Sequence, residues 1–150
     1  NNIVKCIEKG VNVIQTDLDA GLSQFDNKIF DYVIMTQTLQ AIYYPEKLLT
    51  EMTRVGNEAI VTFPNMAHWR CRLQLALGGH MPKSKTLPYE WYNTPNIHLC
   101  SLDDFEDLCI KKNIKTIERA TVDRAHQFSF GMNIFPNLLG EVAIYRFKCE

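Results

Sequence analysis

Polar side chains follow two apolar stretches that have the character of strands. Asp17 comes shortly after residues 11–15, and Thr36 and Gln37 come directly after the apolar run 30–35. In open α/β sheets, ligands bind in the crevice outside the carboxyl ends of the strands. We therefore predict that these side chains lie at a ligand-binding edge. The competing interpretation of Asp17 is that its carboxylate only caps a turn.

Basic residues cluster weakly in the region 66–100, which carries four Lys or Arg and one Glu. Arg70 and Arg72 present planar forks of donors that could bind a carboxylate of a substrate or a partner protein. A solvated basic face explains them equally well. Trp69 falls in an apolar stripe with Leu73, so we predict that it is buried rather than stacked on a ligand.

The stretch 80–100 combines three prolines with aromatic and polar residues, and long irregular connections of this kind usually serve a function. Its aromatic residues Tyr89, Trp91 and Tyr92 suit a lid or a protein-binding surface, because their side chains are apolar with a polar tip. His98 is the acid–base candidate of the chain, since a histidine titrates near neutral pH. A structural role for His98 is the alternative.

Several classes of site lack their sequence signature. The five cysteines are widely spaced with no C-x-x-C, so reduced thiols in a cytoplasmic protein are expected rather than disulfides or zinc. His and carboxylate residues do not have metal-ligand spacing either, so we predict no metal site. There is no G-x-S-x-G nucleophile elbow. A net charge of −1 gives no support for binding to nucleic acid or to anionic membranes.

Apolar periodicity predicts the elements that carry these residues. Strands are expected at 11–15, 30–35, 59–63, 114–122 and 142–147, and helices at 3–9, 45–55, 66–77 and 102–112. Pro45 and Gly56 bound the second helix, and Ser101 with Asp104 forms a capping box at the last one. The continuous apolar run at 30–35 is typical of a strand buried on both faces.

Strands that alternate with helices indicate an α/β fold with a mostly parallel sheet. The last two strands, with no helical pattern between them, predict an antiparallel pair at one edge of that sheet. The whole chain, 1–150, is expected to form one domain, with an inserted helix and a lid-like segment at 66–100.

The chain resembles the MetW family of class I S-adenosylmethionine-dependent methyltransferase-like proteins. The resemblance extends over essentially all 150 residues and is carried by five motifs. These are Gln37-Thr38-Leu39-Gln40, Phe63-Pro64-Asn65, His68-Trp69-Arg70, the string from Leu87 to Cys100, and Pro136-Asn137-Leu138-Leu139-Gly140-Glu141. The resemblance implies a Rossmann-like sheet that ends in an antiparallel hairpin.

The resemblance also implies roles for individual residues. Asp17 would accept a hydrogen bond from the adenine amino group of S-adenosylmethionine, and the Leu18 backbone N–H would contact a ring nitrogen. Thr36 and Gln37 would cover the sulfonium region of the cofactor. None of the seven glycines forms G-x-G, whereas the family has a Gly-rich loop after its first strand. The N-terminal βαβ part of the family fold is therefore expected to lie upstream of Asn1.

Two functions are compatible with the resemblance. The first is a methionine-biosynthesis protein that acts with the homoserine O-acyltransferase MetX and possesses an S-adenosylmethionine site. The alternative is a methyltransferase that acts on a small molecule, since methyl transfer from a sulfonium depends mainly on positioning. The residues do not decide whether the chain is itself an enzyme, because they show no evident general base.

Overall fold

The computed structural model describes residues 2–84, 86–123, 127 and 130–149. The first part of the chain contains α1 (Asn2–Glu8), a 3-10 turn η1 (Leu18–Ala20), β1 (Phe30–Thr36), a second 3-10 turn η2 (Leu39–Ala41), α2 (Pro45–Val55) and β2 (Gly56–Pro64). The second part contains α3 (Trp69–Gly78), α4 (Leu102–Lys111), β3 (Ile114–Val122), the short helices α5 (Phe130–Ile134) and α6 (Pro136–Leu139), and β4 (Val142–Cys149).

The four strands form one mixed sheet in the order β1-β2-β4-β3. β1 and β2 are parallel, and β4 runs antiparallel to both of its neighbours, β2 and β3. Three strands therefore share one direction, as expected for this α/β fold. The prediction that the last two strands form an antiparallel pair at one edge is confirmed, with β3 as the edge strand and α5 and α6 in the connection between them.

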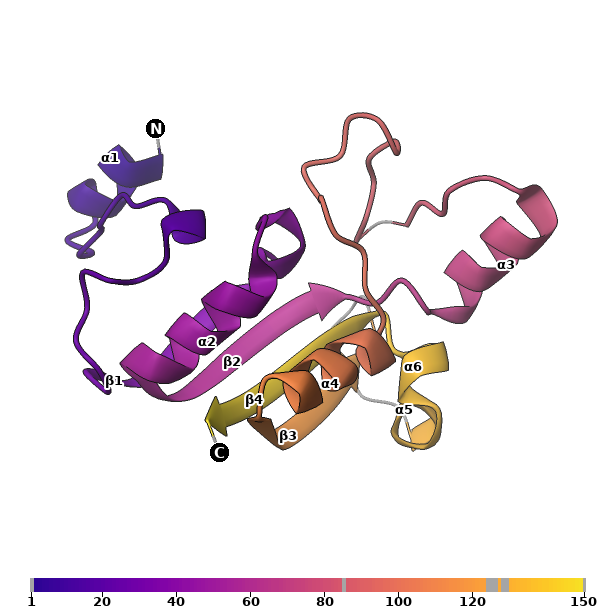
Figure 1. Cartoon of the computed structure of the whole chain (residues 1–150). Coiled ribbons are helices and arrows are strands. Elements are labelled where there is room, and N and C mark those ends of the chain that lie inside the picture. Colours follow the sequence, from indigo (N-terminus) through magenta and orange to yellow (C-terminus); the bar gives the residue numbers. More distant parts are fainter. Residues whose placement is uncertain (1, 85, 124–126, 128–129, 150) are drawn as a thin grey trace.

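One face of the sheet carries the core. Helices α2 and α4 lie side by side on this face (Figure 1), and they bury Leu49, Met52 and Phe105 against Phe63 of β2 and Tyr145 of β4. The rings of Phe63 and Tyr145 are stacked, with centroids 5.9 Å apart. Alternate residues of β2 and β4 point into this layer because successive strand side chains point to opposite faces.

The opposite face of the sheet is less well covered. Tyr32 and Ile34 of β1 are 54% and 63% exposed, and only Val33 and Met35 pack toward α2. The prediction that the strand at 30–35 is buried on both faces is therefore wrong. The physical reason is that α2 covers a single face of β1. The apolar side chains of β1 that point to the opposite face therefore remain in contact with solvent.

Residues 11–15 do not form a strand, which corrects a second prediction. Strands are defined by hydrogen bonds to a neighbouring strand, and the four-stranded sheet in the described part of the chain includes no pairing to this stretch. α1 ends at Glu8, and Gly10, with a φ of +69°, lies in the turn that follows. Figure 1 shows α1 and this stretch beside the sheet rather than within it.

The loop 18–28 is held against the end of α2 by charged side chains. Arg54 pairs with Glu51 at 2.7 Å and also donates to the carbonyl oxygens of Leu22 and Phe25. Lys28 donates through its ammonium group to the carbonyl oxygens of Thr53 and Gly56. These contacts fix the chain that leads from η1 into β1.

Helix α3 extends away from the sheet, and the irregular stretch 79–101 forms a separate projection (Figure 1). α3 begins at Trp69 rather than at residue 66, with His68 as its N-cap. Trp69 is 39% exposed and Leu77 is 83% exposed. The prediction that Trp69 is buried is wrong, because the apolar stripe of α3 does not pack against the core. Within the described residues, none of the helices is both long and apolar enough to cross a bilayer.

Candidate functional site

The loops that could form a site converge at one edge of the sheet. β1 and β2 are parallel, so Thr36 and Pro64 end at the same edge, and Val142 at the start of β4 pairs with Pro64 there. We call this edge the rim. It is the place where ligands bind in α/β sheets. Among the hollows of the described residues, one opens at the rim beside β1 and another opens beside β2 and β4.

The first hollow, the β1 crevice, has a volume of about 270 Å³ and a mainly apolar lining. Leu18 and Leu22 contribute from the loop that precedes β1, and Thr36 and Thr38 contribute from its carboxyl end. The remaining lining comes from β1 and α2. The crevice therefore brings together two of the predicted site residues, Leu18 and Thr36, which are far apart in the sequence.

Asp17 lies next to this crevice as the N-cap of η1, and its side chain is exposed. Its Oδ1 accepts a hydrogen bond of 3.0 Å from the backbone N–H of Asp19. Asp19 in turn accepts from the backbone N–H groups of Tyr43 and Tyr44, at 2.8 and 3.2 Å. The turn that carries Asp17 and Leu18 is thus tied to the loop after β1. The capping interpretation of Asp17 therefore describes a real contact.

Gln37 has a φ of +51°, a conformation that non-glycine residues rarely adopt. Its backbone N–H donates to the carbonyl oxygen of Thr62 at 2.8 Å, which holds the turn immediately after β1 against β2. Such strained backbone occurs often at functional sites. Thr36 and Gln37 are both exposed at the rim, as the sequence predicted.

His98 is brought to the rim by the end of the irregular segment. The backbone N–H groups of Ile97 and His98 both donate to the carbonyl oxygen of Gln40, at 2.7 and 3.0 Å. The His98 ring nitrogen Nε2 lies 3.3 Å from the carbonyl oxygen of Tyr43. The imidazole is exposed and contacts backbone. This geometry explains how His98 anchors the segment, and it does not assign it an acid–base role.

The second hollow is larger, with a volume of about 440 Å³, and we call it the α3 cavity. Most of its lining residues are of polar or charged types, although their apolar atoms form the larger part of its surface. The residues are Asn65, His68, Arg70, Cys71, Gln74, Lys83, Ser84, Thr86, Pro88 and Glu141. They come from the end of β2, from α3, from the segment after α3 and from the residue before β4.

Hydrogen bonds of side-chain amides build the walls of the α3 cavity. The buried Asn65 donates through Nδ2 to the carbonyl oxygens of Asn137 and Gly140, both at 2.9 Å, and accepts from the Ala67 N–H. Gln74 donates to the carbonyl oxygen of Lys83 and accepts from the N–H of Lys83. Asn65 therefore joins the end of β2 to the turn before β4, and Gln74 fastens the irregular segment to α3.

Gly140 allows the turn before β4 to approach the sheet closely. A Cβ atom at this position would lie 2.6 Å from Cβ of Thr121 and 2.8 Å from the carbonyl oxygen of Pro136, both far inside van der Waals contact. The absence of a side chain at residue 140 thus sets the position of Glu141 in the cavity wall.

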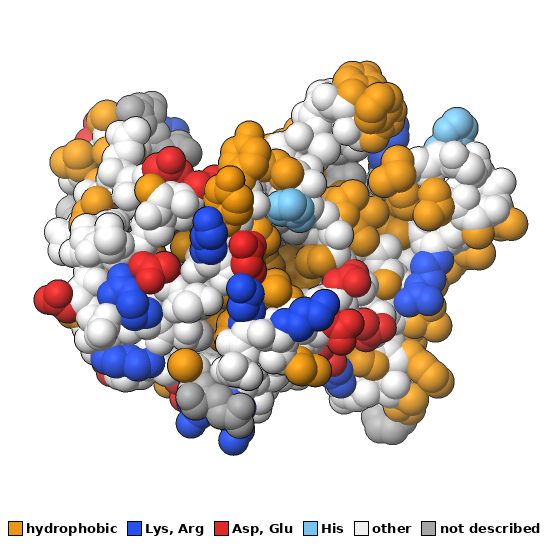
Figure 2. Space-filling model, viewed as in Figure 1, with side chains coloured by type: hydrophobic (Ala, Val, Ile, Leu, Met, Phe, Trp, Pro, Cys, Tyr) orange, Lys and Arg blue, Asp and Glu red, His pale blue; other side chains and the backbone are white. Residues whose placement is uncertain are grey.

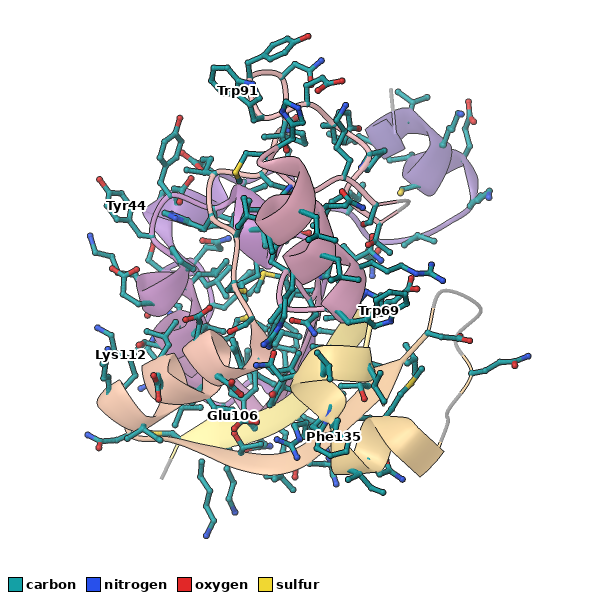
Figure 3. The ribbon with its side chains drawn as sticks, turned by 90° about the vertical axis from the view of Figure 1, so that its right-hand side faces the viewer. Tyr44, Trp69, Trp91, Glu106, Lys112 and Phe135 are labelled. Carbon is teal, nitrogen blue, oxygen red and sulfur yellow. The ribbon has the colours of Figure 1, made fainter. Side chains whose placement is uncertain are left out.

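Two ion pairs involve charged residues of the α3 cavity lining, although Glu90 itself lies outside that lining. Nη1 of Arg70 lies 3.8 Å from Oε1 of Glu141, and Lys83 pairs with Glu90. The guanidinium of Arg70 also lies over the ring of Trp69, 5.2 Å from its centroid. Figure 3 shows Trp69 near the end of α3 that adjoins the sheet. Burial raises the pKa of the Cys71 thiol, with a further contribution from Glu141, so Cys71 stays protonated and is a poor nucleophile.

The structure separates other residues that the sequence grouped together. Arg72 does not line the α3 cavity, because its Nε donates to the carbonyl oxygen of Ala67 on the exposed side of the helix. Tyr89, Trp91 and Tyr92 are 50%, 73% and 70% exposed. Trp91 lies at the tip of the projection, away from the sheet (Figure 3), where a hydrophobic cap is visible in Figure 2. The described residues contain no group of three His, Cys, Asp or Glu close enough to hold a metal ion.

Asn65, Gln74 and Glu141 line the α3 cavity but were not among the residues that the sequence patterns singled out. Asn65 and Glu141 are the last residues of two motifs, 63–65 and 136–141, so a signal for both was present. Their proximity was not apparent, because 75 residues separate them in the chain and only the pairing of β2 with β4 brings them together. Gln74 has no comparable signal.

A family model described as "Methionine biosynthesis protein MetW" matches residues 1–147. The chain belongs to the MetW family. A relative of this MetW chain, the bifunctional methionine biosynthesis protein MetXA/MetW of Rhodopirellula baltica, is 35% identical over 150 residues. That alignment covers 99% of this chain and 24% of the relative, so the chain spans about a quarter of the relative's length.

Several solved structures with the same fold are described as methyltransferases. A methyltransferase of Thermotoga maritima, described as S-adenosylmethionine-dependent and possibly a histamine N-methyltransferase, superposes with a TM-score of 0.61 at 17% identity. That match covers 100% of the MetW chain and 70% of the other protein. The magnesium protoporphyrin IX methyltransferase of Synechocystis, solved with bound S-adenosylhomocysteine, has a TM-score of 0.52 at 11% identity and covers 91% and 50%. These similarities establish a Rossmann-like methyltransferase fold for the MetW chain.

The β1 crevice of this MetW chain suits part of S-adenosylmethionine. Apolar walls from Leu18, Leu22 and Met52 would accommodate an adenine ring, and the polar groups of the lining are the Thr36 and Thr38 hydroxyls. Asp17 is not a lining residue, but it directly precedes Leu18 in the chain. This combination of an apolar slot with few polar groups is typical of cofactor sites. The residues present are thus compatible with the group that the fold implies.

Proposed function

We propose that this chain acts with a homoserine O-acyltransferase of the MetX type in the acylation of homoserine, as a partner subunit or regulator. The observation that carries the proposal is the relative from R. baltica, whose name joins MetXA and MetW in one polypeptide. Two modules on one chain meet at a high effective concentration. Fusion is therefore what we expect for two proteins that work as a unit.

The structure offers a surface for such a partner. Tyr89, Trp91 and Tyr92 project from the irregular segment with at least half of each side chain exposed, and Leu75 and Leu77 on α3 are also exposed. Exposed aromatic residues are enriched at protein interfaces and carry much of the binding energy there. We call these residues the projection surface and propose that MetX docks on it. Arg72 adds a positive charge to this surface.

We further propose that the β1 crevice binds S-adenosylmethionine. Asp17, Leu18, Thr36 and Gln37 would hold it: the carboxylate would accept from the adenine amino group, and the loop after β1 would cover the sulfonium end. The bound group would supply an activated methyl donor, or a signal of methionine supply. His98, the acid–base candidate, contacts the carbonyl oxygen of Tyr43, and this proposal assigns it no proton-transfer role.

A methyltransferase that acts on a small molecule is the second candidate. In its favour, the β1 crevice and the α3 cavity open at the same edge of the sheet, as a cofactor site and an acceptor site must. Methyl transfer needs chiefly alignment of donor and acceptor, so the lack of a base near the crevice does not disfavour it. The α3 cavity would then hold the methyl acceptor.

The test of the leading proposal measures the rate of homoserine acylation by MetX with and without this chain. We expect the rate to change when the chain is added, and we expect Trp91→Ala combined with Tyr92→Ala to abolish that change. Phe135→Ala is the matched control, because Phe135 is an exposed aromatic residue (59%) at the opposite end of the molecule in Figure 3. An unchanged acylation rate with the unmodified chain would contradict the partnership. Transfer of a labelled methyl group to a small acceptor would instead favour the second candidate.

A further inference from the structure

The side chain of Asp19 joins two segments that both lead to walls of the β1 crevice. Its Oδ1 accepts hydrogen bonds from the backbone N–H groups of Tyr43, at 2.8 Å, and of Tyr44, at 3.2 Å. Asp19 belongs to η1, the turn before β1, whereas Tyr43 and Tyr44 lie between η2 and α2. Hydrogen bonds to an ionised carboxylate are stronger than those between neutral groups. One charged oxygen therefore holds the two segments at a fixed separation, and we call this contact the Asp19 bridge.

The turn on one side of the Asp19 bridge is also bonded internally. The N–H of Ala20 donates to the carbonyl oxygen of Asp17 at 3.2 Å, and the N–H of Gly21 donates to that of Leu18 at 3.1 Å. The side chain of Asp17 accepts from the N–H of Asp19. Leu18, inside this turn, lines the β1 crevice. Because the turn is short and bonded to itself, a displacement of Asp19 also displaces Leu18.

The segment on the other side of the bridge leads directly into α2. Tyr44 is the N-cap of α2, and its own side chain makes no capping hydrogen bond. Asp19 brings a carboxylate to this end of the helix, where the helix dipole stabilises a negative charge. Leu48 and Met52, further along α2, line the β1 crevice. The bridge thus fixes the start of α2 relative to the turn that carries Leu18.

Asp19 acts on the crevice through these walls and not by contact with a ligand. It is partly buried and is not among the lining residues of the crevice. The walls that it connects are apolar, and an apolar slot binds a flat ring largely through close contact. A gap of about 0.5–1 Å already forfeits about a quarter to a half of the dispersion attraction between two surfaces. A small change in the separation of the walls therefore has a large effect on the binding of a ring.

We propose that Asp19 is a positioning residue that sets the width of the β1 crevice for the base of a nucleoside ligand. This inference rests on the proposal that the crevice binds S-adenosylmethionine. The bonds of Asp19 to Tyr43 and Tyr44 hold the Leu18 wall and α2 at the separation that a planar base fills. The ligand depends on the position of the carboxylate oxygen and not on its negative charge.

The test is calorimetric titration of S-adenosylmethionine into the full chain and into three variants of Asp19. Asp19→Ala removes the bridge, and we expect the affinity to fall by about tenfold or more. Asparagine serves about as well as aspartate as an acceptor at helix N-termini, so Asp19→Asn should stay within about threefold of the unmodified chain. Asp19→Glu keeps the charge but moves the carboxylate by one methylene group. We expect its affinity to fall about as far as that of Asp19→Ala.

Asp104→Ala is the matched control for a general loss of stability. Asp104 accepts from the backbone N–H of Ser101 at 2.8 Å, in the capping box of α4, and it is not a lining residue of the β1 crevice. Its substitution should lower the midpoint of thermal unfolding, as Asp19→Ala does, yet leave the affinity for S-adenosylmethionine unchanged. Thermal unfolding of each variant verifies that it is folded at the temperature of the titration.

The outcomes separate this inference from the cofactor proposal. Unchanged affinity in Asp19→Ala, or an equal loss in Asp104→Ala, would overturn the role of Asp19 and leave the cofactor proposal standing. A loss in Asp19→Asn as large as that in Asp19→Glu would also overturn it, because the charge and not the bridge would then matter. This comparison decides the question even if Asp19→Ala does not fold. Undetectable binding to the unmodified chain would overturn the cofactor proposal and the role of Asp19 together.

Discussion

The hydroxyl group of Tyr145 donates a hydrogen bond of 2.7 Å to Oε1 of Glu106, from a ring that is fully buried in the core. Arg119 donates to the same oxygen at 2.8 Å. Glu106 of α4 is thus held by one residue of β4 and one of β3. Burial and the neighbouring Glu106 raise the pKa of Tyr145 above its ordinary value, so the phenol remains a donor at every physiological pH.

Tyr145→Phe tests the strength of this contact. The substitution removes one donor and leaves Glu106 paired with Arg119, so we expect a loss of about 1 kcal/mol in the free energy of unfolding, measured by urea denaturation. Glu106→Ala should cost more, because it leaves a buried hydroxyl group without its acceptor. If the Tyr145→Phe variant has the same free energy of unfolding as the unmodified protein, water replaces this hydrogen bond without a loss of stability.

Asn65→Asp tests the joint between β2 and the turn before β4. A carboxylate in this place faces the carbonyl oxygens of Asn137 and Gly140 with no donor, so we expect a loss of about 3 kcal/mol or more at neutral pH. Asn65→Ala should lose about 2 kcal/mol. The loss in free energy of unfolding caused by Asn65→Asp should become smaller as the pH falls, because protonation gives the carboxyl group one hydrogen-bond donor.

Asn12→Asp is the matched control for this experiment, because Asn12 is exposed in the stretch before η1. Its free energy of unfolding should change little at any pH. A similar loss at both positions would mean that Asn65 has no special role, and the assigned hydrogen bonds would then be wrong.

Asp17→Asn separates the cap of η1 from a role in cofactor binding. Asparagine also accepts from the backbone at an N-cap, so stability should change by less than about 0.5 kcal/mol. The loss of the negative charge should weaken binding of S-adenosylmethionine by about tenfold, because hydrogen bonds to charged groups are the stronger ones. Calorimetric titration of the cofactor against both proteins measures the change. If binding is present and unaffected, Asp17 acts only as a cap.

Alkaline pH should destabilise the fold through two thiols, the partly buried Cys100 and the buried Cys109. Burial is the main cause that raises the pKa of Cys100 and of Cys109 to about 11. The folded state therefore favours the neutral thiols, and this stabilisation is complete below the unfolded pKa near 9 and is lost as the pH rises toward 11. Each thiol contributes up to about 2–3 kcal/mol.

The measurement is the free energy of unfolding, by urea, between about pH 8 and pH 11. The unmodified protein should lose stability over this range more steeply than a double variant, Cys100→Ala with Cys109→Ala. Equal slopes would show that the thiols do not titrate differently in the folded and unfolded states.

Local patterns predicted most of the elements correctly. Pro45 and Gly56 bound α2, and Ser101 and Asp104 form the capping box of α4, because these signals act within a few residues of the chain. The apolar runs at β1 and β2 identify strands for the same reason. The stretch 11–15 carries a similar signal, yet it forms no strand in the described structure, since a strand also requires a neighbour.

Burial was less predictable than element type. Trp69 and Leu73 have helical spacing, and α3 is indeed a helix. Its apolar stripe does not contact the core, because α3 extends away from the sheet. Periodicity reports which side chains share a face of a helix. Whether that face is covered depends on the direction in which the helix leaves the sheet.

The amino-acid sequence determined the family, the α/β class and the position of Thr36 at the end of a strand, and it predicted which residues at 66–100 are suited to chemistry. Tertiary structure decided which of those residues lie close together. It placed Arg70, and not Arg72, beside Glu141, through the antiparallel pairing of β2 with β4 and the close approach that Gly140 permits. Contacts within one turn or strand are encoded by neighbouring residues, whereas a charged pair 71 positions apart exists only once the whole sheet has formed.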